Sequence, residues 1–192
     1  MTHYFTNDYI KSDEKTVLVK IKEQNFKFKV DNGVFSKKGL DFGTRTLLEN
    51  LPILKGNVLD FGCGYGPIGI YIAKTYNCNV DMIDINNRSL SLANKNSKIN
   101  KVEVNVFASN IYENITKKYD YIVTNPPIRV GNKILYQILI DAKKHLKKDG
   151  ELWLVINKNQ GAKTIYKELE KHYTTSLITK NKGFYIIRAQ NM

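Results

Sequence analysis

The sequence has few residues that could build a disulfide framework, a metal site or a membrane anchor. Its two cysteines, Cys63 and Cys78, are too few and too far apart for a zinc site, and we expect both to act as small apolar residues. The three histidines, His3, His145 and His172, are scattered. There is no apolar run long enough to span a membrane, and the first residues lack the pattern of a signal peptide. These absences predict a cytoplasmic protein without a bound metal.

Acidic residues are also scarce. The chain has 18 Asp and Glu against 30 Lys and Arg, which gives a formal net charge of +12. A basic surface suits a polyanion, and nucleic acid is the commonest one. Lysine far outnumbers arginine, however, although bidentate phosphate recognition favours arginine. The charge therefore favours a nucleic-acid partner, and genome composition is the alternative explanation.

Apolar periodicity predicts helices that alternate with strands after a short β region. Two strands are expected within residues 16–30, connected at Glu23-Gln24-Asn25, because apolar and basic residues alternate there. A helix then begins at Asp41 and ends at Pro52. The later elements are expected as strands at 58–60, 79–84, 102–107, 119–124, 151–156, 175–179 and 184–189, and helices at 67–76, 86–100, 132–146 and 161–172.

This order predicts an α/β protein with a Rossmann-like, doubly wound fold. Alternating strands and helices require right-handed crossovers and a mainly parallel sheet, here of seven strands, covered on both faces. The last two strands are joined only by the turn Asn181-Lys182-Gly183, so they must form an antiparallel hairpin. We expect a single domain over residues 1–192, with a β extension at 1–35 and the core at 36–192.

Four glycines, Gly62, Gly64, Gly66 and Gly69, follow the strand at 58–60 and open the next helix. Ligands of open α/β sheets bind beyond the carboxyl ends of the strands, where glycines let the backbone approach them closely. The last three of these glycines match the G-x-G-x-x-G dinucleotide pattern. Asp84 lies about twenty residues further on, where that pattern places a ribose-binding acid. A nicotinamide-dependent dehydrogenase is therefore one hypothesis.

Asp60, directly before the glycines, favours a cationic ligand instead. A dinucleotide places its pyrophosphate on this helix N-terminus, and a nearby carboxylate would repel it. S-adenosylmethionine has no phosphate and carries an ammonium and a sulfonium. Asp84 suits the ribose hydroxyls of either ligand. Asn110, after the third strand, could bind the adenine edge or simply begin a turn.

The candidate catalytic segment, Asn125-Pro126-Pro127-Ile128, follows the fourth strand. Its two prolines have a fixed φ and no N–H donor, so the segment is stiff. The side-chain carbonyl of Asn125 and the backbone carbonyl of Pro126 would present two acceptors at fixed positions. They could orient an exocyclic amine toward a sulfonium methyl group. A rigid loop without a catalytic role is the alternative.

These motifs resemble those of known methyltransferases. The segment from Asp60 to Gly66 looks like the cofactor signature of class I S-adenosylmethionine-dependent methyltransferases, and Asn125-Pro126-Pro127 resembles the signature of enzymes that methylate adenine N6, guanine N2 or glutamine. A narrower resemblance is to the RsmC-type family of 16S rRNA guanine-N2 methyltransferases. It rests on five blocks that occur in order: Gly33-Val34-Phe35-Ser36, Gly39-Leu40-Asp41-Phe42-Gly43, Phe107-Ala108-Ser109-Asn110, Asn125-Pro126-Pro127, and Gly150-Glu151-Leu152 with Asn157.

The resemblance implies a role for each motif residue and a ribosomal RNA, or the small ribosomal subunit, as partner. Phe35 and Arg129 are candidates for substrate binding. The target amine would be held by Asn125 and Pro126, with Pro127 and Ile128 completing the catalytic motif. The cofactor, S-adenosylmethionine, would be held by Asp60, Gly62, Cys63, Gly64, Gly66, Asp84, Ile85, Asn110 and Asn125.

The sequence departs from the family pattern in two ways. Ile128 stands where the motif usually has Phe or Tyr, whose ring stacks on the target base and contributes about 1–3 kcal/mol. Phe35 or Tyr65 could supply an aromatic surface instead. The best-known members also carry an additional N-terminal domain, which is not expected here. Adenine N6 and a protein glutamine therefore stay as alternative targets, followed by a nicotinamide oxidoreductase and a non-catalytic RNA-binding domain.

Overall fold

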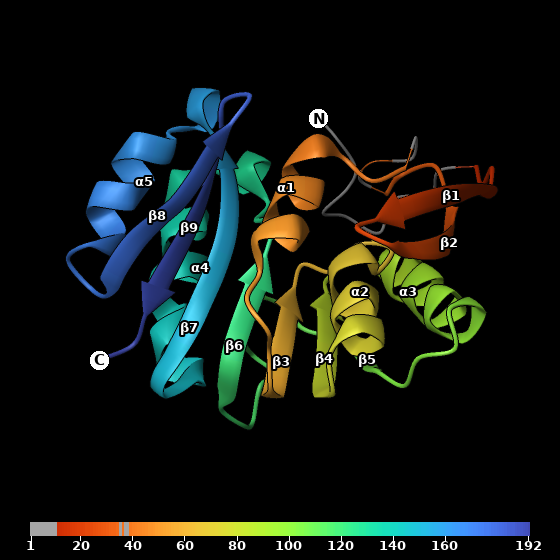
Figure 1. Cartoon of the computed structure of the whole chain (residues 1–192), viewed down its shortest axis with the longest axis horizontal. Coiled ribbons are helices and arrows are strands. Elements are labelled where there is room, and N and C mark those ends of the chain that lie inside the picture. The colour runs from red at the N-terminus through yellow and green to blue at the C-terminus, as the bar shows by residue number, and fades with distance from the viewer. Residues whose placement is uncertain (1–10, 35, 37–38) are drawn as a thin grey trace.

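The computed structural model describes residues 11–34, 36 and 39–192 (Figure 1). The fold predicted from the sequence is confirmed: a seven-stranded sheet has the order β5-β4-β3-β6-β7-β9-β8, and β1 and β2 form a separate hairpin. The strands are β1 (Lys15–Ile21), β2 (Gln24–Val30), β3 (Gly56–Phe61), β4 (Cys78–Asp84), β5 (Asn105–Ala108), β6 (Tyr119–Thr124), β7 (Leu146–Asn157), β8 (Thr174–Asn181) and β9 (Phe184–Gln190). The α-helices are α1 (Phe42–Asn50), α2 (Pro67–Thr75), α3 (Asn87–Ile99), α4 (Asn132–His145) and α5 (Ala162–Leu169), and two short 3₁₀ helices are η2 (Ile128–Val130) and η3 (Lys158–Gln160).

The sheet is parallel from β5 to β7 and antiparallel at its β7-β9-β8 side. Successive residues of β3 face opposite layers. Val58 packs into a core with α1, α2 and α3, whereas Leu59 packs into a core with α4 and α5. The chain moves outward from β3 to β4 and β5 and then returns to β6, so the strand order reverses between β3 and β6. Ligands bind at such a switch point in open α/β sheets.

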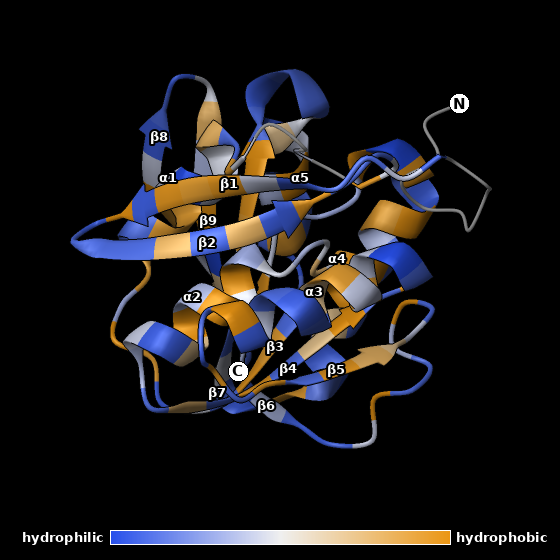
Figure 2. Ribbon diagram, turned by 90° about the vertical axis from the view of Figure 1, so that its right-hand side faces the viewer, coloured by the Kyte–Doolittle hydropathy of each residue, from blue (hydrophilic) through white to orange (hydrophobic). Residues whose placement is uncertain are grey.

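The N-terminal hairpin packs on α3, with further contacts to α1 and α2 (Figure 2). Lys22 and Glu23 form its turn, so Gln24 and Asn25, which we expected in the connection, already belong to β2. One edge of β2 pairs with β1, and two asparagines, one near the end of α3 and one at its C-cap, bind the other edge. The distance between the two asparagines along the helix axis matches the distance between their partners along β2, because four helical residues rise about 6 Å and two strand residues about 6.6 Å.

Asn96 and Asn100 make these contacts. The backbone N–H of Lys29 donates to Asn96 Oδ1 at 2.7 Å, and Asn96 Nδ2 donates to the carbonyls of Lys29 and Tyr65 at 2.9 and 2.8 Å. Asn100 binds the N–H and the carbonyl of Lys27 in the same way, at 3.1 and 2.8 Å. Side chains of a helix thus satisfy a strand edge that would otherwise be open to pairing.

Three element boundaries differ from the sequence prediction by three residues or more. Strand β5 begins at Asn105 rather than at 102, because the N–H of Val102 donates to Ser97 O and closes the end of α3. Strand β7 begins at Leu146 rather than at 151, because Leu146 already pairs with Tyr119. Helix α5 ends at Leu169 rather than at 172, and the chain then makes turns before β8.

Within the described residues, no helix is long and apolar enough to cross a membrane. That part of the chain also contains no group of three or more His, Cys, Asp or Glu side chains placed to hold a metal ion.

Asn96→Ala should reduce the free energy of unfolding by about 3 kcal/mol, because it leaves half-buried backbone groups of Lys29 and the buried carbonyl of Tyr65 without partners. Urea denaturation followed by circular dichroism measures the change. Asn94→Ala is the matched control on the same helix, since Asn94 is exposed and its amide reaches only the carbonyl of Leu90. We expect the control to stay within about 0.5 kcal/mol of the parent. Equal stability of the two variants would show that the asparagine does not hold the hairpin.

Candidate active site

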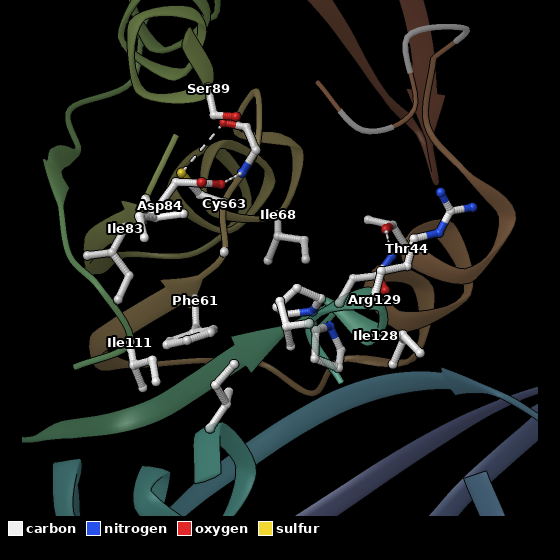
Figure 3. A pocket seen from close by; sticks show the side chains of 18 of the residues that line it. Thr44, Phe61, Cys63, Ile68, Ile83, Asp84, Ser89, Ile111, Ile128 and Arg129 are labelled. Atoms are coloured by element: carbon white, nitrogen blue, oxygen red, sulfur yellow. Dashed lines mark hydrogen bonds between the residues drawn. The ribbon is translucent and has the colours of Figure 1, made fainter. Parts of the chain in front are cut away.

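A cavity of about 540 Å³ opens at the carboxyl edge of the sheet, beside the switch point between β3 and β6 (Figure 3). Its walls come from the turns after β3, β4, β5 and β6 and from the start of α1. Most of the residues predicted from the sequence meet here. They are Gly62, Cys63, Gly64, Asp84, Ile85, Asn110, Asn125, Pro126, Pro127, Ile128 and Arg129. Asp60 and Gly66 are not among the lining residues, and Phe35 lies outside the described residues.

The glycines of the turn after β3 have two different functions. Gly62 and Gly64 line the cavity with φ of +71° and +56°, and no atom beyond the adjacent residues of the chain lies within 4 Å of an ideal Cβ at either position. A side chain there would be strained and would narrow the cavity. Gly66 and Gly69 instead allow α2 to pack against β4, because an ideal Cβ would lie 2.8 Å from Cε and 2.6 Å from Cγ of Met82, respectively.

Asp60 lies beneath the turn rather than in the cavity wall. Its side chain is fully buried, and Oδ2 accepts a hydrogen bond from the N–H of Gly69 at 2.8 Å. Its other oxygen, Oδ1, is buried without a hydrogen-bond partner among the described residues. Burial raises the pKa of this carboxyl to about 7; the hydrogen bond from Gly69 opposes the rise, and the negative charge of Asp84 contributes to it. Asp60 therefore does not contact a ligand in the cavity directly. It can act on a ligand only electrostatically, through the turn above it.

Asp84 ends β4 and faces the cavity. Its Oδ2 accepts from the N–H of Gly64 and its Oδ1 from the N–H of Asn86, both at 2.9 Å. Burial raises the pKa of this carboxyl, and these backbone hydrogen bonds oppose the rise. Figure 3 shows Asp84 beside Cys63 on one wall. Cys63 is also buried, which raises the pKa of its thiol well above the ordinary value, so it is a neutral part of the wall.

Asn110 both begins a turn and lines the cavity, so the two interpretations of this residue are compatible. Its backbone carbonyl accepts from the N–H of Glu113 at 3.1 Å, and its Nδ2 donates to Glu113 Oε1 at 2.9 Å. That side-chain contact directs the amide while its carbonyl oxygen keeps accepting capacity. Ile85, which is 43% exposed, adds an apolar surface near Asp84.

Asn125 is oriented by a residue that the sequence did not single out. Its Nδ2 donates to Oγ1 of Thr44 at 2.9 Å, and Thr44 is buried in the first turn of α1. The N–H of Thr44 in turn donates to Oδ1 of Asp41, which caps that helix. Because the amide nitrogen is held, the orientation of the side-chain carbonyl is set as well. The helix cap at Asp41 is the sequence signal nearest to this contact.

The segment after Asn125 supplies an apolar part of the cavity wall. Ile128 begins η2, is half-buried against the core that includes α4, and lines the cavity; Arg129 is exposed at its mouth. Tyr65 does not replace the missing aromatic residue: its ring is 2% exposed and packs edge-on against Phe28 at 5.4 Å. Among the described lining residues only Phe61 is also aromatic, and it is 6% exposed. The accessible apolar surface of the cavity is therefore aliphatic.

The model of the methyltransferase small domain matches residues 25–188. The chain belongs to the methyltransferase small domain family. It is therefore an S-adenosylmethionine-dependent methyltransferase, and the enzyme class and cofactor predicted from the sequence are confirmed. Between the two cofactors that the glycine pattern allowed, the family decides against the nicotinamide dinucleotide.

Individual relatives differ in how much of their length they share with this methyltransferase. Uncharacterized protein YbxB of Bacillus subtilis is 39% identical, over 99% of this chain and 98% of its own. Ribosomal RNA small subunit methyltransferase C of Colwellia psychrerythraea is 39% identical over 82% of this chain, but over only 45% of its own length. The chain thus spans about half the length of the relatives with that name.

Among solved structures, T. thermophilus 16S rRNA N2 methyltransferase (RsmC), in complex with AdoMet and guanosine, superposes with a TM-score of 0.84. The match covers 96% of this chain and 52% of that one at 22% identity, and it shows the shared fold. The open space at Gly62 and Gly64 fits a cofactor held against this turn, and the acidic side chain of Asp60, buried beneath the turn, favours a positive charge there.

The raised pKa of Asp60 predicts a pH dependence of stability. A carboxyl whose pKa rises from 3.8 to about 7 on folding stabilises the protein most below pH 4, and this contribution is lost as the pH rises to 7. The stability difference between the parent and Asp60→Asn should therefore change by up to about 1.4 kcal/mol per pH unit between pH 5 and 7. Urea denaturation without cofactor at several pH values measures it.

Asp120→Asn is the control for that series. Lys147 holds the pKa of Asp120 below its usual value, against the effect of burial, so Asp120 stays ionised from pH 5 to 8. Its effect on stability should be constant over that range. A constant effect of Asp60→Asn as well would mean that Asp60 is ionised in the folded protein.

Thr44→Val should lower the turnover number for methyl transfer by about 10- to 100-fold, because Asn125 loses the acceptor that orients its amide. The dissociation constant of S-adenosylmethionine should stay within about two-fold of the parent. Thr46→Val is a matched control, since Thr46 is also buried in α1 but donates only to the carbonyl of Phe42. Thr44→Ser should restore turnover; equal loss in both valine variants would point to a general effect on α1.

Proposed function

We propose that this methyltransferase transfers a methyl group to an exocyclic amine, and that the amine is guanine N2 of small-subunit ribosomal RNA. The observation that carries the proposal is the pair of acceptors formed by Asn125 and Pro126. The side-chain amide of Asn125 is held by Thr44, and the proline backbone is stiff. Both acceptors belong to the cavity that also contains Asp84 and the glycine turn.

The two acceptors suit the chemistry of an aromatic amine. Its nitrogen lone pair is delocalised into the ring, so it is a weak nucleophile until the nitrogen becomes pyramidal. Asn125 Oδ1 and the Pro126 carbonyl would each accept one N–H and point the lone pair into the cavity. The same oxygens stabilise the positive charge that develops on nitrogen. When bound, S-adenosylmethionine supplies an electrophilic methyl group.

No basic side chain is needed before the transfer. The amine nitrogen forms its bond to the methyl carbon as the bond from that carbon to sulfur breaks, and the nitrogen then loses one proton to solvent. Among the described residues, no histidine lines the cavity. Positioning and carbonyl dipoles therefore account for the catalytic contribution of this chain.

The opposite wall would hold the cofactor. Asp84 keeps accepting capacity for the ribose hydroxyls, and Asn110 keeps a carbonyl oxygen for the adenine amine. The backbone at Gly62 and Gly64 leaves room for the methionine part. Asp60, from beneath the turn, favours its ammonium electrostatically. The catalytic core in this proposal is residues 36–192, and 1–35 are an N-terminal β extension.

Three observations support an RNA target. Relatives 39% identical over 82% of this chain are named ribosomal RNA small subunit methyltransferase C. The solved methyltransferase of the same fold carries guanosine together with AdoMet. The net charge of +12 suits a polyanion rather than an ordinary protein substrate. A ribosomal target would also place the enzyme in the cytoplasm.

The test is transfer of a labelled methyl group to unmodified small ribosomal subunits and to free small-subunit ribosomal RNA, followed by nucleoside analysis. N2-methylguanosine is the expected product. If the product is N6-methyladenosine, the target is adenine N6 rather than guanine N2. If the label is found only in protein, the target is glutamine. Comparison of the two substrates shows whether free RNA or the assembled particle is modified.

In this assay Asn125→Ala should lose at least about 100-fold in turnover while S-adenosylmethionine still binds, because one of the two acceptors is removed. Cofactor binding is measured by calorimetry or by thermal shift. Asn79→Ala, at an exposed asparagine of β4 whose amide contacts only Asn57, is the control and should behave like the parent. Turnover of Asn125→Ala near the parent rate would refute the catalytic role of Asn125.

A further inference from the structure

Charge is distributed unevenly along the carboxyl edge of the sheet. The turns on the cofactor side, residues 62–66, 84–86 and 109–113, contain Asp84 and Glu113 and no Lys or Arg. Three segments on the target side, 125–134, 157–163 and 180–183, contain no Asp or Glu, and the start of α1 adds one acidic residue, Asp41. The cations of the three segments, which we call the basic rim, are Arg129, Lys133, Lys158, Lys163, Lys180 and Lys182.

The tertiary structure brings these segments to one edge. Strand β9 runs antiparallel to β7, so the turn between β8 and β9 lies at the carboxyl end of β7, at the same end of the sheet as α1 (Figure 1). The N–H of Lys158 donates to the carbonyl of Gly183 at 2.7 Å. The ammonium of Lys182 lies 4.9 Å from the centre of the Phe42 ring, and Phe42 directly follows the lining residue Asp41 in the sequence. Gln160, two residues after Lys158, lines the cavity itself.

The lysines of the rim are not neutralised by carboxylates. Within the described part of the chain, no ion pair joins Lys133, Lys158, Lys163, Lys180 or Lys182 to an acidic side chain within 4.0 Å. Several lysines elsewhere on the surface are paired, among them Lys144 with Asp141, Lys147 with Asp120 and Lys171 with Glu168. Lys180 and Lys182 lie over the rings of Tyr185 and Phe42, which position the ammonium groups without cancelling their charge.

We infer that the basic rim binds the phosphate backbone of the RNA that carries the target base. A base that enters the cavity from the β6 side leaves its sugar and phosphates at the mouth, where the rim begins at Arg129. Phosphates on the opposite side would meet the charges of Asp84 and Glu113. The charge pattern therefore sets the side from which the strand approaches. The inference rests on the proposed function only for the identity of the polyanion.

These lysines should control affinity rather than chemistry. Their ammonium groups act as point charges that bind phosphate without reading sequence. Removal of one lysine that binds a phosphate should reduce the slope of log K against log salt by about 0.7 to 0.9. Substitution of rim lysines by neutral residues should therefore raise the KM for RNA and leave the turnover number at saturating RNA unchanged.

The experiment uses the double variant Lys158→Gln with Lys182→Asn. Lys182 has φ of +45°, a conformation that Asn tolerates well, so this change removes charge and preserves the turn. The control is Lys55→Gln with Lys98→Gln, which lowers the net charge equally. Both control lysines are exposed, have no carboxylate within 4.0 Å in the described chain, and lie at the amino edge of the sheet, Lys55 just before β3 and Lys98 near the end of α3.

Equilibrium binding of a labelled small-subunit ribosomal RNA transcript is measured over a series of KCl concentrations. The rim variant should bind about ten-fold more weakly at low salt and reduce the slope by about 1.4 to 1.8, whereas the control stays within about two-fold of the parent. The dissociation constant of S-adenosylmethionine should be the same in all three proteins.

Equal slopes for the rim variant and the control would overturn the inference, as would a parent protein that does not bind RNA at low salt. Polyglutamate that competes as well as RNA at equal charge concentration would also overturn it, because the rim would then recognise any acidic polymer. If RNA binding requires the rim but no methyl group is transferred to RNA, the proposed function is refuted and the inference about the rim is retained.

Discussion

The site depends on the hydrogen bond that joins the end of β3 to the first turn of α2. The buried carboxylate of Asp60 accepts the N–H of Gly69, while the absence of a side chain at Gly69 lets α2 approach Met82 of β4. In the turn between these two points, Gly62 and Gly64 line the cavity. Asp84 holds the same turn from β4 through Gly64. Two buried carboxylates thus shape a wall of backbone that suits a cationic cofactor.

The target side is aligned with that wall by contacts between segments distant in sequence. Thr124 donates from its Oγ1 to the carbonyl of Phe61 at 2.8 Å, which joins the end of β6 to the end of β3. Thr44 then orients Asn125 from α1. Methyl transfer needs the nitrogen and the methyl group in line, so small errors in this alignment are costly. Rigid contacts at both strand ends are consistent with catalysis by positioning.

The electrostatic layout separates the two substrates of such an enzyme. Acidic groups surround the place proposed for the cofactor, and six cations border the place proposed for RNA. The long-range attraction of the rim would act before any base enters the cavity. The aliphatic surface at Ile128 then supplies apolar contact without an aromatic ring. Affinity for RNA would therefore depend more on contacts with the RNA backbone than on base stacking.

The sequence by itself determined the alternation of strands and helices, the antiparallel last hairpin, the glycine turn and the Asn-Pro-Pro segment. These features depend on local periodicity and on the backbone limits of Gly and Pro, which are properties of short segments. Only the tertiary structure decided that Asp60 is buried under the turn, that Tyr65 belongs to the core, and that Thr44 holds Asn125 across 81 positions. It also extended β7 back to Leu146, through pairing with Tyr119. Such contacts depend on packing between elements, which no local pattern specifies.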